Sequence, residues 1–213
     1  MNNSMMNPDP IHNSRPYVQG ILLCGGRSSR MGTDKALLEV SGQPLLVRSC
    51  RQLAQLCDGV TVVCLAEKLE HYRSLLTAEP FSVSFTLDQY PGKGPLAGIH
   101  AGLDSLRQTG YGFVVACDMP WIDSVLYERL VQETSDDPDW VGCDRQPLHA
   151  LYHSRLTSNA EAFLQLDKLR LWSFVDQLQS RIVDYDQQDC FRNLNSPEEY
   201  QAYLQRISSR SQE

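Results

Sequence analysis

The chain has 213 residues, of which 42% are hydrophobic, enough to bury the core of one ordinary α/β domain. Its formal net charge of -7 argues against a general nucleic-acid surface, because binding to duplex nucleic acid needs a basic face. No apolar run approaches the roughly 20 residues that cross a bilayer, so we expect neither nucleic acid nor a membrane among the partners. Any anion site must therefore be local.

The cysteines and the first residues indicate the compartment. Seven cysteines, an odd number, are scattered without a C-x-x-C pair, which is typical of reduced thiols in a cytoplasmic protein. The segment from Met1 to Pro16 is polar and lacks the apolar core of a signal peptide. We therefore expect a disordered tail over residues 1–16 and a single domain over residues 17–213.

The first predicted strand, Val18 to Leu23, runs into a polar loop with paired glycines. Gly25 and Gly26 lack a Cβ, so their backbone can turn sharply and bring N–H groups close to an anion. Arg30 and Lys35 can add charge-assisted bonds to phosphate oxygens. The Walker pattern and the dinucleotide glycine pattern are both absent. A glycine turn with a solvated basic tip is the alternative explanation for this stretch.

Strands and helices alternate along the rest of the chain. Further strands are predicted at 60–65, 81–87, 111–117, 140–143, 147–152 and 181–185. Helices are predicted at 44–56, 67–76, 95–109, 123–134, 156–166, 171–178 and 197–207. The early strands are nearly all apolar, as strands covered on both faces are. The pattern predicts a three-layer α/β/α sandwich with a Rossmann-like, mainly parallel sheet.

Two acidic side chains follow predicted strands. Asp88 begins a polar loop that also contains Gly94 and Pro95, and Asp118 is the only acid at the end of the strand from Tyr111. Open α/β sheets bind ligands at the carboxyl ends of their strands. Mg²⁺ is often held by one or two carboxylates plus substrate phosphates, so we predict that Asp118 binds it. On residue type alone, a turn cap is the better explanation of Asp88.

The last predicted helix has a complete N-terminal signal. Ser196 is placed as the N-cap, Pro197 as the first helical residue, and Glu199 as the partner in a capping box. That motif explains these residues in structural terms. It leaves Asn193 and Asn195 unexplained.

The glycine loop resembles the signature of the MobA-like nucleotidyltransferases, L-A-G-G-x-S-x-R-M-G-x-D-K. The matching residues are Leu23, Cys24, Gly25, Gly26, Ser28, Arg30, Met31, Gly32, Asp34 and Lys35, with Cys24 in place of the usual Ala. Later stretches resemble further motifs of the family in the expected order, namely an acid before G-P-L-A-G, then C-D-x-P and N-x-N-T-P-E-E. The resemblance extends from Val18 to Tyr203.

The resemblance implies the nucleotide-diphospho-sugar transferase type of fold and a nucleotidyltransferase activity. GMP would pass from GTP to the phosphate of molybdopterin, which releases pyrophosphate and forms molybdopterin guanine dinucleotide. The resemblance implies Mg²⁺ as cofactor. It also implies partners among the proteins that insert molybdopterin and the molybdoenzymes that receive the product.

The resemblance assigns roles to particular residues. The catalytic residues are Arg30, Lys35 and Asp118, of which Asp118 also binds the metal. The nucleotide-binding residues are Leu23, Cys24, Gly25, Gly26, Lys35, Asp88 and Asp118. The residues of the acceptor site or cleft are Gly94, Pro95, Asn193 and Asn195. Arg145 and His149 are candidates for contact with the acceptor, and a hairpin with a polar turn explains them equally well.

Rival functions share parts of this pattern. Gly25 and Gly26 fit the guanine class, since cytidylyl-transferring relatives tend to show Ala-Gly there. A molybdopterin cytidylyltransferase and a sugar-phosphate nucleotidyltransferase are the alternative enzymes. A non-catalytic module that senses GTP or hands cofactor to a partner is the alternative from another class. The charges of Arg30, Lys35 and Asp118 count against that module, because a sensor has little need for charge at the α-phosphate.

Overall fold

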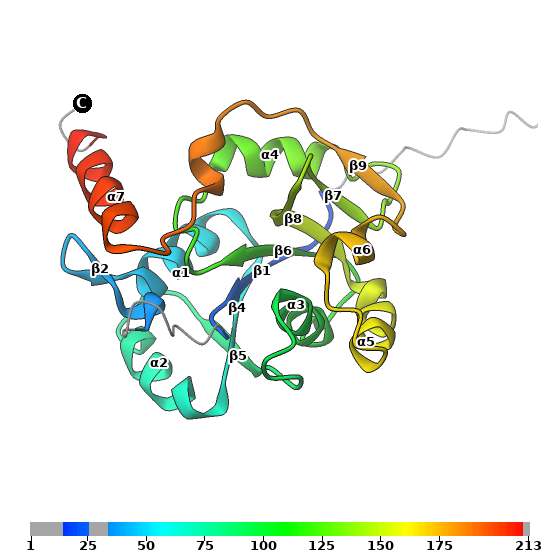
Figure 1. Cartoon of the computed structure of the whole chain (residues 1–213), viewed down its shortest axis with the longest axis horizontal. Helices are drawn as coiled ribbons and strands as arrows, with labels where there is room; N and C mark the ends of the chain where they lie inside the picture. Colours follow the sequence, from blue (N-terminus) through cyan, green and yellow to red (C-terminus); the bar gives the residue numbers. More distant parts are fainter. Residues whose placement is uncertain (1–14, 26–33, 211–213) are drawn as a thin grey trace, which may run out of the picture.

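The computed structural model describes residues 15–25 and 34–210, and its centre is a seven-stranded sheet between two layers of helices (Figure 1). The strand order is β5-β4-β1-β6-β8-β7-β9. The strands are β1 (Val18–Leu23), β4 (Gly59–Cys64), β5 (Val83–Leu87), β6 (Tyr111–Ala116), β7 (Trp140–Cys143), β8 (Gln146–His153) and β9 (Ser180–Ile182). The predicted three-layer sandwich is confirmed.

The first half of the sheet is parallel and the second half is mixed. Strands β5, β4, β1 and β6 run parallel in neighbouring pairs, while β8 pairs antiparallel with both β6 and β7. The predicted hairpin is thus β7 and β8, and β9 adds a parallel strand at the outer edge. Because parallel strands end at one edge, β4, β1, β5 and β6 present their carboxyl ends together.

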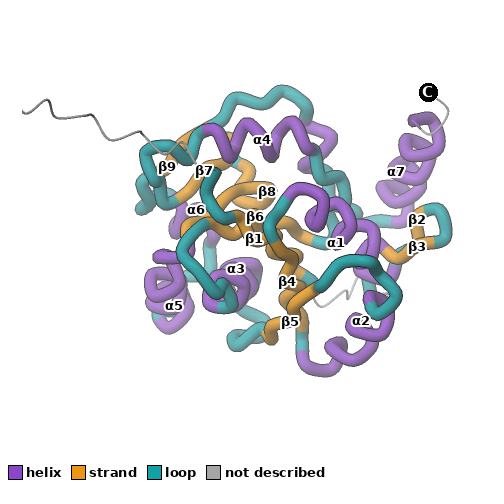
Figure 2. The backbone as a smooth tube through the Cα atoms, turned by 180° about the vertical axis from the view of Figure 1, so that it is seen from behind, coloured by secondary structure: helices purple, strands orange, loops and turns teal. Residues whose placement is uncertain are grey.

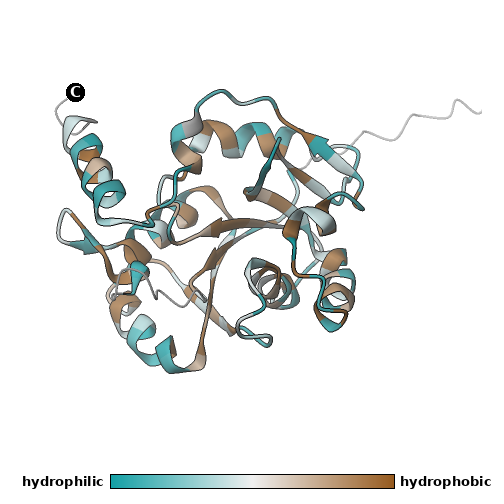
Figure 3. Cartoon of the chain, in the orientation of Figure 1, coloured by the Kyte–Doolittle hydropathy of each residue, from teal (hydrophilic) through white to brown (hydrophobic). Residues whose placement is uncertain are grey.

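Helices cover both faces of the sheet (Figure 2). One face packs against α1 (Leu45–Leu56), α2 (Leu69–Leu76) and α4 (Ser124–Gln132). The other face packs against α3 (Pro95–Asp104), α5 (Thr157–Gln165) and α6 (Leu171–Val175). Hydrophobic residues gather on the strands and on the helix faces toward them (Figure 3). Two apolar layers therefore hold the sheet in place.

A small satellite packs outside the main layers. It consists of α7 (Pro197–Arg210) and the two-stranded ribbon of β2 (Glu39–Val40) and β3 (Gln43–Pro44), which share a hydrophobic cluster. The predicted capping box is confirmed at the start of α7, since the Glu199 N–H donates to Ser196 Oγ (3.3 Å) and Glu199 Oε2 accepts from the Ser196 N–H (2.9 Å). No helix within the described ranges is long and apolar enough to cross a bilayer.

Several predicted boundaries are wrong at one end. The helix predicted over 95–109 stops at Asp104, because the Ser105 hydroxyl bonds the Gly102 carbonyl (2.7 Å) and competes with the helical pattern. The strand predicted over 181–185 is only Ser180–Ile182, since its partner β7 is itself short. The helix predicted from residue 44 begins at Leu45, with Pro44 in β3. Residues 1–14 of the predicted tail lie outside the described residues. Arg15, which the prediction also placed in the tail, contacts Tyr127 through its guanidinium.

Helix α3 lies close to β1 because of its glycines. A Cβ on Gly102 would lie 2.5 Å from Cγ2 of the fully buried Ile21. We expect Gly102→Ala to lower the free energy of unfolding by about 1–2 kcal/mol in urea denaturation, because overpacking costs more than the gain in helix propensity. Gly98→Ala, one turn earlier, is the control: its Cβ would meet only the flexible end of Leu23 at 3.0 Å. Equal losses in both variants would contradict this explanation.

Candidate functional site

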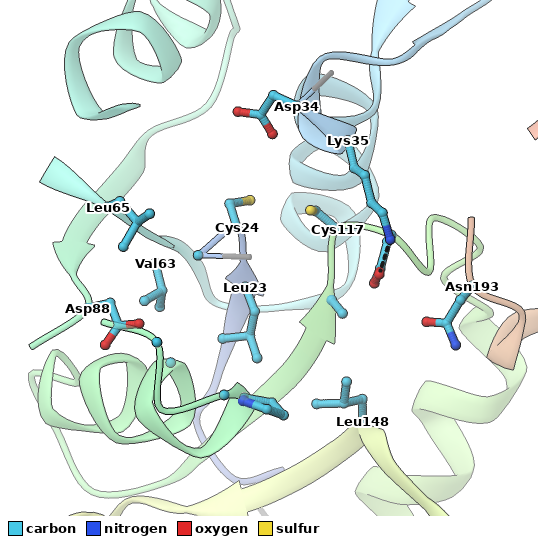
Figure 4. A pocket seen from close by; sticks show the side chains of 17 residues that line it. Leu23, Cys24, Asp34, Lys35, Val63, Leu65, Asp88, Cys117, Leu148 and Asn193 are labelled. Carbon is cyan, nitrogen blue, oxygen red and sulfur yellow. Dashed lines mark hydrogen bonds and ion pairs between the residues drawn. The ribbon is translucent and has the colours of Figure 1, made fainter. Parts of the chain in front are cut away.

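A cavity of about 630 Å³ opens at the carboxyl edge of the parallel strands (Figure 4). Its wall includes Leu23, Cys24 and Gly25 at the end of β1, and Cys117 and Asp118 directly after β6. The strand ends thus deliver the first glycine of the loop and the predicted metal ligand to one space. Gly26 and Arg30, the other predicted residues of the loop, lie outside the described residues.

Lys35 and Asp118 meet at one side of this cavity. Lys35 begins a short 3₁₀ turn (Lys35–Leu37), and its Nζ lies 3.0 Å from Asp118 Oδ2. The same Nζ donates to Asn195 Oδ1 (2.6 Å). Side-chain exposures of 17% for Lys35 and 26% for Asp118 leave both groups accessible from the cavity. A cation and an anion are therefore held together where a substrate can reach them.

The segment before α7 completes this side. The Leu194 N–H donates to the Asp118 backbone carbonyl (2.7 Å), which fixes the chain between Asn193 and Asn195 against the end of β6. Asn193 lines the cavity, and Asn195 bonds Lys35. Glu199 Oε2 also accepts from the Asn195 N–H (2.6 Å). Glu199 of the capping box thus also binds the backbone of Asn195, one of the two asparagines that the sequence motif did not explain.

Asp34 fixes the 3₁₀ turn that begins at Lys35. Its Oδ1 accepts from the Ala36 N–H (3.2 Å) as the cap of the 3₁₀ turn, and its Oδ2 accepts from Tyr72 Oη (2.7 Å). Lys68 Nζ lies 3.0 Å from the same oxygen. Burial raises the pKa of Tyr72 well above its usual value, so the phenol stays protonated and donates to the carboxylate. These contacts fix the turn that carries Lys35.

Asp88 lies at another side of the cavity, next to the glycine loop. Its Oδ1 accepts from the Tyr90 N–H (2.8 Å), and its Oδ2 would be 3.5 Å from a Cβ on Gly25. Burial raises the pKa of Asp88, although the Tyr90 N–H and the His100 side chain act in the opposite direction. The carboxylate both caps its turn and faces the cavity, so the two explanations of Asp88 are compatible.

The loop after Asp88 reaches the cavity through Gly94 and Pro95. Gly94 has φ +76°, a conformation that favours glycine, and Pro95 is the first residue of α3. Both residues line the cavity, as does Gly98 on the next turn of the helix. A side chain at Gly98 would narrow the space beside Leu23.

Part of the lining is apolar and was not predicted from the sequence. Val63 and Leu65 come from the end of β4, and Leu148 comes from β8. The end of β4 gave a usable signal, since β4 was predicted to end at the same edge as β1. Leu148 gave none, because its position depends on how the hairpin packs beside β6. These side chains give one part of the cavity a surface suited to a planar, weakly polar group.

Arg145 and His149 do not line the cavity. The Arg145 side chain is 89% exposed in the hairpin turn, and His149 is buried, with its Nε2 3.1 Å from the Met119 carbonyl. Burial lowers the pKa of His149 to about 4, so the ring is neutral near pH 7. The hairpin explanation therefore holds for both residues, and contact with an acceptor is not supported.

A parallel sheet with a cavity and polar groups at the carboxyl ends of its strands is typical of an enzyme that binds a nucleotide or a similar ligand there. A sequence profile for the MobA-like NTP transferase domain matches residues 20–182. The chain belongs to the MobA-like NTP transferase family. Its activity as a nucleotidyltransferase follows from that membership.

Curated relatives extend over most of the chain. The molybdenum cofactor guanylyltransferase of Vibrio atlanticus is 35% identical over 185 residues, which cover 84% of this chain and 91% of that protein. The probable molybdenum cofactor guanylyltransferase of Peptoclostridium acidaminophilum is 30% identical over 216 residues, with 92% of both chains covered.

Solved structures share the fold at lower identity. Molybdopterin-guanine dinucleotide biosynthesis protein A from Archaeoglobus fulgidus gives a TM-score of 0.74 at 22% identity and covers 90% of this chain and 99% of that one. The 4-diphosphocytidyl-2C-methyl-D-erythritol synthase of Anaerococcus prevotii gives a TM-score of 0.67 at 12% identity, with 91% of this chain and 96% of that chain covered. The predicted nucleotide-diphospho-sugar transferase type of fold is confirmed.

Proposed function

We propose that this protein transfers GMP from GTP to the phosphate of molybdopterin, releasing pyrophosphate and forming molybdopterin guanine dinucleotide. The observation that carries the proposal is the pair of Lys35 Nζ and Asp118 Oδ2, 3.0 Å apart in the wall of the cavity. The names of the relatives from Vibrio atlanticus and Peptoclostridium acidaminophilum support this choice of nucleotide and acceptor.

The reaction needs alignment and charge neutralisation more than a strong base. A phosphate monoester has a second pKa of about 6, so the acceptor is already an anion near neutral pH. Lys35 binds the phosphates and offsets charge that develops in the transition state. The Gly25 N–H adds a backbone donor at the end of β1. Gly26 and Arg30 belong to the same proposed phosphate site on sequence grounds.

The residues present fit a magnesium ion that is shared with the substrate. Asp118 presents one partly exposed carboxylate, and no group of three His, Cys, Asp or Glu in the described ranges could bind a metal alone. A single carboxylate suits Mg²⁺ when phosphate oxygens supply further ligands. Asp118 would hold the ion, which supplies positive charge at those oxygens. Lys35, which also donates to Asn195 Oδ1, orients the Asp118 carboxylate.

The nucleoside belongs beside Asp88 in this proposal. Asp88 offers a carboxylate acceptor to N–H or hydroxyl groups, and it faces Gly25, so that the base and sugar lie close to the phosphate loop. Val63 and Leu65 provide apolar contact for a flat ring. The acceptor then approaches past Gly94, Pro95 and the two asparagines.

Pyrophosphate release tests the proposal. The purified protein is given GTP or CTP with Mg²⁺, each with molybdopterin or with a sugar phosphate. We expect release only with GTP and molybdopterin. Preference for CTP would identify a cytidylyltransferase, and release with a sugar phosphate would identify the other enzyme class. GTP binding without release from any acceptor would identify a GTP-binding module.

The setting of the reaction is also part of this proposal. All seven cysteines are free thiols, in keeping with a reducing cytoplasm. The product would pass to the proteins that insert molybdopterin and on to target molybdoenzymes. Labelled product that transfers directly to such a protein in a binding assay would support this handover, and exchange only through free solution would contradict it.

A further inference from the structure

A row of cysteines crosses the parallel sheet where the cavity begins. The register pairs Leu23 of β1 with Val63 of β4 on one side and with Ala116 of β6 on the other. The next residues along the three strands are Cys24, Cys64 and Cys117. Because paired strands keep their register, Cys24 lies directly between Cys64 and Cys117.

The three side chains point to the same face of the sheet. Cys24 and Cys64 belong to the hydrophobic cluster under α1 and α2, and Cys117 packs against that cluster. Only Cys24 and Cys117 also line the nucleotide cavity, and Cys117 alone of the three is partly exposed. Figure 4 shows the sulfur atoms of Cys24 and Cys117 turned toward one another.

Burial and a hydrogen bond with Cys117 raise the pKa of Cys24 well above its usual value. Cys24 is therefore a neutral thiol at physiological pH and a poor first target for an oxidant. Cys117 is the thiol that a small oxidant reaches from the cavity. The pair thus has one accessible member and one sheltered member at the ends of neighbouring strands.

We infer that Cys24 and Cys117 form an oxidation site, a dithiol in the wall of the nucleotide cavity that a peroxide closes to a disulfide. In the first step the Cys117 thiol attacks the peroxide, becomes a sulfenic acid and releases water from hydrogen peroxide. In the second step the Cys24 sulfur forms the S–S bond with Cys117, and the Cys24 proton leaves with the hydroxyl group as a second water. Two electrons pass from the two sulfurs to the peroxide, and an external thiol returns them.

The spacing of the strands allows this disulfide to close. Opposite residues on neighbouring strands lie about 4.8 Å apart. The Cα atoms of a disulfide are usually about 4.4–6.8 Å apart, so the bond can form from this spacing. Because Cys117 is partly exposed in the cavity wall, an external thiol can reach the disulfide and reduce it.

Closure joins the two strand ends that carry site residues and restricts their positions, because Gly25 follows Cys24 and Asp118 follows Cys117. A displacement of about 1 Å in a reacting geometry can cost on the order of a hundredfold in rate. We therefore expect oxidation to lower the turnover of the protein ten- to a hundredfold, and dithiothreitol to restore it. This effect on turnover rests on the proposed guanylyltransferase function, whereas the disulfide itself does not.

Peptide mapping tests the disulfide without reference to activity. The reduced full-length protein is treated with a small excess of hydrogen peroxide, its free thiols are alkylated, and its peptides are analysed unreduced by mass spectrometry. We expect a loss of two hydrogens and a Cys24–Cys117 linkage. A Cys24–Cys64 linkage, or oxidation of Cys117 to a sulfinic acid without any linkage, would overturn the inference.

Variants connect the disulfide to turnover, with each variant compared with its own reduced form. The same peroxide treatment should lower the turnover of Cys117→Ser and of Cys24→Ala by less than twofold. Cys64→Ala, on the other side of Cys24, is the matched control and should respond as the wild type does. A full oxidative loss in Cys117→Ser would overturn the role of the pair. A mapped disulfide in a protein that shows no transferase activity would instead fault the proposed function.

Discussion

Lys35→Ala and Asp118→Ala should each reduce turnover a hundredfold or more, or about 2.7 kcal/mol of transition-state stabilisation. Lys35→Ala removes a positive charge from the proposed phosphate site and leaves the Asp118 carboxylate without its partner at 3.0 Å. Asp118→Ala removes the proposed magnesium ligand. Both side chains are partly exposed, so we expect the thermal unfolding temperature to change little. Pyrophosphate release at saturating GTP and Mg²⁺ measures the first effect, and circular dichroism measures the second.

Matched substitutions separate position from charge. Lys168→Ala and Asp104→Asn remove a surface lysine and a surface aspartate that do not line the cavity, and they should leave turnover within about twofold. Lys35→Arg keeps the positive charge and should retain more turnover than Lys35→Ala. Near-normal turnover in both alanine variants would reject the assigned roles. Loss of fold in either variant would show that the pair is structural.

The polar half of the site could be predicted because of where its residues stand in the sequence. The glycine loop and Asp118 each come directly after an apolar strand, and parallel strands end at one edge of a sheet. The proximity of Lys35 and Asp118 follows from that rule together with the short link from the loop to Lys35. The contact between Lys35 and Asn195 does not, since it depends on the docking of the segment before α7.

The apolar half could not be predicted in the same way. Val63, Leu65 and Leu148 have the pattern of core residues. The predicted end of β4 indicates the edge where Val63 and Leu65 lie, but only the packing of the strands shows that Leu148 borders the cavity. The sequence did not predict that Cys24, Cys64 and Cys117 lie side by side, because their alignment depends on the register between the strands. Local patterns therefore place residues on elements, and tertiary packing decides which elements meet.

His149 shows how tertiary context can change the meaning of a residue. In the sequence it lies in an extended stretch where an acceptor contact and a hairpin were equal explanations. In the structure it has φ +56° within β8, and its ring packs near Phe113 and Phe191. Its Nε2 bonds the carbonyl of Met119, the residue after Asp118. His149 thus contacts the backbone directly after β6, next to the proposed metal ligand Asp118.

The free energy of unfolding should fall as the pH drops from about 6.5 to about 4, by roughly 3 kcal/mol in total. Burial lowers the pKa of His149 from 6.5 in the unfolded chain to about 4 in the fold. The unfolded state therefore binds a proton within this pH window that the folded state does not. His149 Nδ1 has no hydrogen-bond partner in the described part of the chain, so protonation would bury an unpaired N–H. Urea denaturation at intervals of half a pH unit measures the change.

His149→Asn is the decisive variant for this pH dependence. Asparagine tolerates a positive φ better than most residues, and its amide does not titrate in the window. We expect His149→Asn to be less stable than the wild type at pH 7.5 and to lose little further stability down to pH 4.5. His71→Asn, on the exposed face of α2, should keep the wild-type slope. His153 also has a lowered pKa caused by burial, so a smaller part of the slope should persist in His149→Asn. An unchanged slope in His149→Asn would assign the acid sensitivity to other groups, because only the loss of this imidazole distinguishes that variant.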